Sequence, residues 1–132
     1  MGAKKNTNIK KIHTSKESIF KYWLRFLKPY HKLRDGEIEA LSTMLYYRYE
    51  LSREVNNPEL VDRLLFSTET RAKVREKLNN MGQKVFNNLL TSLRSKGVLS
   101  KDNKINPVLI PNMTEDGFSL IFDFEIKENE TK

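Results

Sequence analysis

The 132-residue sequence contains no cysteine, and this absence excludes several kinds of chemistry at once. Disulfide bonds, thiolate nucleophiles and the usual structural zinc sites all need a side chain that the chain lacks. Histidine occurs only at His13 and His31, and no acidic residue accompanies either one at a catalytic or metal-binding spacing. The five glycines form no phosphate-binding loop. We therefore expect a protein that is not an enzyme and that holds neither a metal nor another cofactor.

Long apolar runs are missing as well. No segment approaches the length of a membrane-spanning helix, and no apolar signal segment follows the first lysines, so we expect no membrane contact. Hydrophobic residues make up 38% of the chain and charged residues 31%, which is typical of a small domain with much surface for its volume. The expected location is a reducing cytoplasm.

The net charge is +7, and it is unevenly distributed along the chain. Residues 1–34 contain ten basic residues and one acidic residue, and residues 77–101 contain five basic residues and no acidic ones. Residues 35–76 and 102–132 are net negative, at −3 and −4. Zones of positive charge attract polyanions, so this distribution favours nucleic acid as a partner. A lysine-rich surface that only keeps a small protein in solution is the alternative.

The first half of the chain predicts a basic arm followed by helices. Residues 1–14 lack a hydrophobic period and predict a flexible arm with four lysines that could follow a DNA backbone or minor groove: Lys4, Lys5, Lys10 and Lys11. A helix from Ser15 to about Lys28 follows, although alternating apolar residues leave a strand open there. Helices from Asp35 to about Val55 and from Pro58, capped by Asn57, come next. The acidic residues Asp35, Glu37 and Glu39 lie at the start of the helix from Asp35, where negative charge interacts favourably with the helix dipole.

The second half has the order helix, turn, helix, glycine, short strand, turn, strand. A helix from Ser67 or Thr68 ends at a turn in which Gly82 can take a positive φ, and a helix from Gln83 to Lys96 ends at Gly97. This order predicts a helix-turn-helix at about 68–96 and an antiparallel β wing at about 98–110. An alternating run predicts an extra half-buried strand at about 119–127, with Leu120, Phe122, Phe124 and Ile126 inward, and 128–132 is a polar tail. The expected fold is thus mainly α with a small β wing (α+β), in one domain from 15 to 127.

The helix from Gln83 to Lys96 has an outer face suited to a major groove. At 100° per residue, one set of side chains lies opposite the buried leucines: Lys84, Asn87, Asn88, Thr91 and Ser95, with Gln83 at the start. Asparagine can bond adenine, and lysine can reach guanine or phosphate. No acidic residue lies between Lys77 and Lys101, whereas an ordinary solvated helix face usually carries some glutamate. Lys101 and Lys104, at the wing tip, would contact phosphate or the minor groove.

The run GQKVFNNLLTSLRSKGVLSKDNKINPVLIP resembles the recognition helix and wing of winged-helix proteins, such as MarR-like regulators and plasmid or phage replication initiators. The resemblance implies DNA-facing roles for Lys84, Asn87, Asn88 and Thr91, and backbone roles for Arg94 and the wing lysines. It also implies double-stranded DNA as the partner of a transcriptional regulator or replication factor. The chain departs from the pattern at Gly82, where many recognition helices begin with serine or threonine. The whole chain resembles small uncharacterised proteins of phages of gut Bacteroidales, which implies the cytoplasm of a host cell.

Aromatic residues exceed what one face of the first two helices should need. They either complete the core or form a protein interface, for which the candidates are Phe20, Trp23, Tyr46 and Tyr47. A homodimer or a phage structural protein would then be the partner. The alternative function is a virion or assembly component that uses the winged-helix fold for protein contacts.

Overall fold

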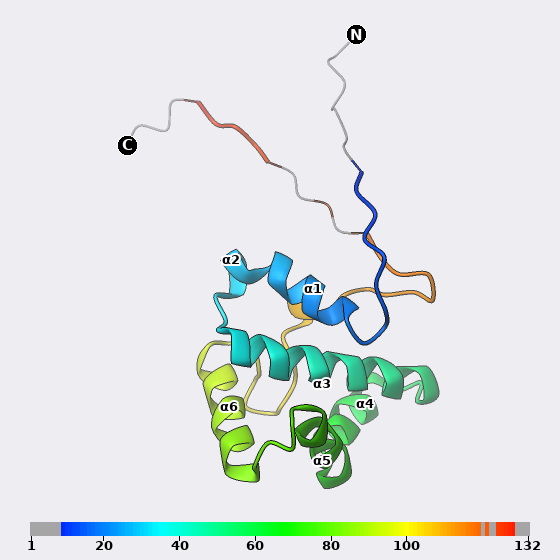
Figure 1. Cartoon of the computed structure of the whole chain (residues 1–132), viewed down its shortest axis with the longest axis vertical. Helices are drawn as coiled ribbons and strands as arrows, with labels where there is room; N and C mark the ends of the chain where they lie inside the picture. The colour runs from blue at the N-terminus through cyan, green and yellow to red at the C-terminus, as the bar shows by residue number, and fades with distance from the viewer. Residues whose placement is uncertain (1–8, 120, 122–123, 129–132) are drawn as a thin grey trace.

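The structure, a computed structural model, describes residues 9–119, 121 and 124–128 of the chain. These residues form six α-helices and one short 3₁₀ helix: α1 (Ile19–Phe26), α2 (Lys28–His31), α3 (Asp35–Glu54), α4 (Pro58–Leu65), α5 (Thr68–Lys77), α6 (Gln83–Ser95) and η1 (Pro107–Leu109). Figure 1 shows the helices gathered in one body, with residues 9–15 and residues 124–128 on the same side of it, beyond α1.

The long helix α3 is the centre of the body. It packs against α1 on one side and against α4, α5 and α6 on the other (Figure 1). Four apolar residues at helical spacing are buried along it: Ile38, Leu41, Met44 and Leu45. They join Phe20 and Leu24 of α1 and Phe86, Leu90 and Leu93 of α6 in one core cluster. Because α3 packs against both α1 and α6, it fixes the position of α6 relative to the N-terminal part of the chain.

The connection from α1 to α3 is held by a histidine, His31. His31 is half-buried, and its Nδ1 accepts a hydrogen bond from the backbone N–H of Leu33 at 2.9 Å. Its Nε2 lies 2.7 Å from the carbonyl oxygen of Leu24. Since Nδ1 is an acceptor, Nε2 carries the ring proton and donates a hydrogen bond to that carbonyl. His31 therefore has a structural role in closing the chain between α2 and α3.

The helix starts follow from local capping chemistry. Asn57 Oδ1 accepts from the backbone N–H groups of Glu59 and Leu60 at the start of α4, as the sequence predicts. Ser67 Oγ accepts from the N–H of Thr70 at the start of α5. The turn before α6 differs from expectation, because Asn79 and Asn80 take the positive φ angles, 60° and 56°, while Gly82 is extended at −66°. Asparagine tolerates this left-handed conformation better than other non-glycine residues.

The predicted β wing is wrong, although the mainly α class is confirmed. Residues 98–106 make one antiparallel bridge, between Leu99 and Ile105, and no strand lies among the described residues. Only two backbone hydrogen bonds cross the loop, from Asn106 N to Val98 O and from Ser100 N to Lys104 O. The pairing stops there because Pro107 has no N–H to donate and starts η1 in place of the second strand. We call residues 98–106 the post-α6 loop.

The extra C-terminal strand is also wrong for the residues that the structure describes. Ile121 and residues 124–128 have no strand structure. Phe124 and Ile126, expected to face inward, are 87% and 92% exposed. Leu120 and Phe122, the other two inward candidates, lie outside the described residues. An alternating run needs a neighbouring strand for its backbone groups, and no described strand offers an edge for pairing.

Candidate nucleic-acid interface

Helix α6 is anchored by one apolar stripe and presents the opposite side to solvent. Phe86, Leu90 and Leu93 are buried in the core, with exposed fractions of 2% or less. Gly97, at φ 78°, then turns the chain so that Val98 and Leu99 also enter the core. The backbone N–H groups of these two residues both bond Leu93 O, which satisfies a carbonyl at the end of the helix.

The side chains expected on the outer face of α6 are all solvent-exposed. They are Gln83, Lys84, Asn87, Asn88, Thr91 and Ser95. Two of the hydroxyl groups donate back to the helix itself, from Thr91 Oγ1 to Asn87 O and from Ser95 Oγ to Ser92 O. Each keeps free lone pairs that can accept a hydrogen bond from outside. No acidic side chain belongs to this face, since α6 contains none.

A residue from the preceding helix joins the face. Arg71 of α5 reaches across to Asn87 of α6, and its Nη2 donates to Asn87 Oδ1 at 2.6 Å. This bond orients the amide of Asn87, engages one lone pair of its oxygen and leaves its NH₂ group available. Sequence spacing could not predict the contact between Arg71 and Asn87, because this contact depends on how α5 crosses α6.

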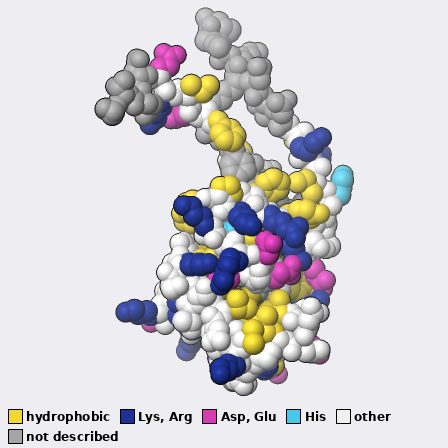
Figure 2. Space-filling model, turned by 60° about the vertical axis from the view of Figure 1, so that its left-hand side comes forward, with side chains coloured by type: hydrophobic (Ala, Val, Ile, Leu, Met, Phe, Trp, Pro, Cys, Tyr) yellow, Lys and Arg dark blue, Asp and Glu magenta, His cyan; other side chains and the backbone are white. Residues whose placement is uncertain are grey.

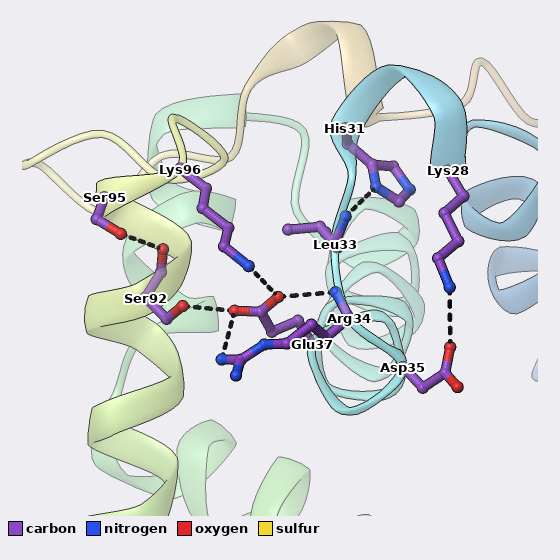
Figure 3. Close-up of polar contacts among 9 residues, drawn as sticks. All are labelled: Lys28, His31, Leu33, Arg34, Asp35, Glu37, Ser92, Ser95 and Lys96. Atoms are coloured by element: carbon purple, nitrogen blue, oxygen red, sulfur yellow. Dashed lines mark hydrogen bonds and ion pairs between the residues drawn. The ribbon is translucent and has the colours of Figure 1, made fainter.

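The C-terminal end of α6 is tied to the start of α3 through a buried carboxylate (Figure 3). Glu37 is 1% exposed, and its carboxylate accepts from Lys96 Nζ at 2.7 Å and from Ser92 Oγ at 2.5 Å. The backbone N–H of Arg34 donates to Oε1 at 2.9 Å, and the Arg34 guanidinium donates to Oε2 at 3.3 Å. We call Glu37 and these three partners the Glu37 cluster.

The cluster keeps Glu37 ionised. Burial alone would raise the pKa of this carboxyl, but hydrogen bonds from Lys96, Ser92 and Arg34 lower the pKa from 4.5 to about 2. The sequence analysis assigned Glu37 only to the helix dipole. Its spacing of four residues from Leu41 and eight from Leu45 was the signal that it lies on the buried stripe.

Arg94, for which the resemblance implies a contact with the DNA backbone, bonds a residue of the post-α6 loop. It is half-buried, and its Nε and Nη2 both donate to Asn103 Oδ1, at 3.2 and 2.6 Å. Asn103 has a left-handed φ of 60° and lies in the post-α6 loop. Arg94 therefore holds that loop against α6, and with it the exposed Lys101 and Lys104.

Basic side chains gather on the side of the molecule that carries α2 and α6. Figure 2 turns this side forward and shows dark blue side chains over the upper part of the body with magenta side chains beside them, and mostly white and yellow surface with scattered dark blue side chains further down. Figure 3 places Lys28, Arg34 and Lys96 together around the α3 start. Arg34 and Lys96 share one carboxylate, so their combined charge stays positive. The acids Glu59, Asp62 and Asp102 line a groove with Lys104 and mark one edge of the basic surface.

The other candidate residues lie away from α6. Lys10 and Lys11 are exposed in the segment 9–15, which lies beyond α1 in Figure 1, and Lys4 and Lys5 lie outside the described residues. Phe20 and Trp23 are buried in the core, and Trp23 Nε1 donates to Leu109 O at 2.9 Å. Tyr46 and Tyr47 are half-buried and form an edge-to-face pair with centroids 5.3 Å apart.

No protein-family model, curated protein or solved structure matches the chain. Among residues 9–119, 121 and 124–128, no group of three or more histidine or acidic side chains is placed to hold a metal ion. No helix in the described part of the chain is both long enough and apolar enough to cross a membrane. The function is therefore argued from the geometry around α6.

Proposed function

We propose that this protein binds double-stranded DNA, with α6 lying in the major groove. The observation that carries the proposal is the outer face of α6, on which six polar or basic side chains are exposed and none is acidic. A 13-residue helix is about 20 Å long, and the major groove, at about 12 Å wide, admits an α-helix.

The basic residues beside α6 are suited to phosphate contacts. Lys84, Lys101 and Lys104 are exposed, and none has an acidic partner within the part of the chain that the structure describes. Arg71 bonds only an uncharged amide and keeps its full charge. Phosphate contacts of this kind set register and affinity, while contacts to base edges set sequence preference.

Within this proposal Asn88 and Asn87 read bases differently. Asn88 has both its amide oxygen and its NH₂ group available for the bidentate contact with adenine. Asn87 has one lone pair of its amide oxygen engaged by Arg71, and its NH₂ group can donate to an acceptor such as guanine O6 or thymine O4. The resemblance of the α6 sequence to the recognition helices of regulators and replication initiators supports a role in transcription control or replication of a phage or another mobile element.

Binding of a labelled duplex library, measured by fluorescence anisotropy at low salt, tests the proposal. The variant Lys84→Glu with Asn88→Ala should bind at least about tenfold more weakly, which corresponds to about 1.4 kcal/mol. The matched control is Lys73→Glu, which makes the same charge change at an exposed α5 position about 200° around the helix from Arg71. Equal binding by the two variants, or no binding by the unmodified protein, would contradict the proposal.

A further inference from the structure

A groove on the far side of the molecule from α6 lies between three segments. It has a volume of about 610 Å³ and is lined by residues 9–16, by the outer side of α1 and by residues 113–119. Its walls include apolar side chains that the fold leaves exposed: Ile9 at 80%, Ile12 at 49%, Tyr22 at 42% and Phe26 at 49%. Apolar surface gathered in this way marks an interaction site.

The groove is held in shape by contacts that link its walls. Trp23 packs edge-on against Phe118, with ring centroids 5.2 Å apart. Glu115 pairs with Lys16 of the N-terminal segment at 3.4 Å and with Arg53 at the end of α3 at 3.3 Å. A bridge between Thr114 and Gly117 closes the turn that carries Glu115. The groove is thus part of the folded body.

The segment that leaves this groove carries side chains of matching character. The chain departs from the rim at Ser119, and Ile121 and Ile126 are 85% and 92% exposed. In sequence, residues 120–126 alternate apolar and other side chains. Figure 1 shows the described part of this segment running away from the body, not across the groove.

Charge complements the apolar match. Residues 120–132 contain four acidic residues and two lysines, whereas residues 1–16 contain five lysines and no acidic residue. Lys10 and Lys11 line the groove, are exposed, and have no acidic partner among the residues that the structure describes. An acidic, apolar segment docked there would gain both apolar burial and electrostatic attraction.

We propose that the groove binds residues 120–127 of a second copy of this chain, in a reciprocal exchange that forms a dimer. Each copy has one groove and one such segment, so a two-fold axis covers both grooves and both segments at once. The seven peptide units from Ser119 to Ile126 span up to about 25 Å when extended, which is enough to reach a neighbouring body. The exchange requires no DNA and is independent of the function proposed above.

The absence of cysteine makes a direct test possible. The variants Tyr22→Cys and Ile126→Cys each carry one thiol, and mixing them under mild oxidation should give the mixed disulfide as the main crosslinked product. Docking raises the effective concentration of the two thiols, so the yield should exceed that of the control mixture, Val108→Cys with Ile126→Cys, by about tenfold or more. Val108 is 57% exposed and does not line the groove.

Light scattering after size-exclusion chromatography supplies the second measurement. The unmodified protein should have about twice the 15.6 kDa mass of one chain, and Ile126→Asp should be monomeric while keeping the helical circular dichroism of the unmodified protein. A monomer at every concentration would overturn the proposal, as would crosslinking yields equal to the control. A disulfide that forms only within one chain of the double variant Tyr22→Cys with Ile126→Cys would show that the segment occupies its own groove and would also overturn it.

Discussion

At the scale of single residues, Glu37 is the side chain on which the placement of α6 depends most. It lies inside the protein, yet it is ionised and accepts hydrogen bonds from α6, from the residue that follows α6, and from the α2–α3 connection. A buried charge with this many partners is costly to disturb, because removing the charge leaves the partners without their acceptor.

The free energy of unfolding should depend on pH through Glu37. The pKa of Glu37 is about 2 in the folded protein, against 4.5 in an unfolded chain, and this difference corresponds to about 3 kcal/mol of unfolding free energy. The stabilisation is fully present above about pH 4.5 and is lost as the pH falls toward 2, since the folded pKa is the lower one. Urea denaturation at a series of pH values should show this slope.

Replacing Glu37 with glutamine isolates this effect. Glu37→Gln should lose about 2–3 kcal/mol at neutral pH and should flatten the slope between pH 4.5 and 2. The control Glu39→Gln removes an exposed ion pair with Lys21 and should cost less than about 1 kcal/mol. Equal losses of unfolding free energy in the two variants would contradict the stabilising role of the Glu37 cluster.

At the scale of elements, helices were predictable and the pairing of extended segments was not. The periodicity of α3 and α6, and the Asn57 and Ser67 caps, are local signals that a sequence contains. The wing and the C-terminal strand depended on partners elsewhere in the chain, and alternation alone does not supply a partner. The outer face of α6 was predictable from its spacing, whereas Arg71 and the Glu37 cluster depend on how helices cross.

Gly97 should be essential to the end of α6, because its φ of 78° is strained for any residue with a Cβ atom. Gly97→Ala should destabilise the protein by about 1–2 kcal/mol in thermal or urea unfolding. The control Gly36→Ala lies in the first turn of α3, where an added Cβ meets nothing within 4 Å, and should be neutral or stabilising. Equal changes in stability for the two substitutions would contradict the left-handed backbone conformation at Gly97.

The post-α6 loop should depend on Asn103 in two separable ways. Asn103→Gly keeps the left-handed backbone at φ 60° but removes the acceptor of Arg94, so it should cost about 1 kcal/mol. Asn103→Ala removes the acceptor and adds backbone strain, so its cost should be larger by about another 1 kcal/mol. Thermal unfolding of the two variants checks the order, which would be reversed if the backbone strain were absent.

At the scale of the whole molecule, the basic residues of the N-terminal zone are divided between two places. Lys28 and Arg34 lie with Lys96 around the start of α3 (Figure 3), whereas Lys10 and Lys11 line the groove beside α1. One sequence feature, an excess of positive charge, therefore supplies two surfaces: one proposed for DNA and one proposed for the acidic segment of a second copy. Linear charge counts cannot distinguish them, because they contain no information on which side a segment packs.

The salt dependence of duplex binding tests the DNA interface most directly. With Arg71, Lys84, Lys101 and Lys104 each neutralising a phosphate, the slope of log K against log salt should be about −3.6 for the unmodified protein. Lys84→Gln should reduce its magnitude by about 0.9, and Lys73→Gln should leave it unchanged. A slope near zero, or one that Lys73→Gln changes as much as Lys84→Gln does, would contradict the binding of DNA through α6.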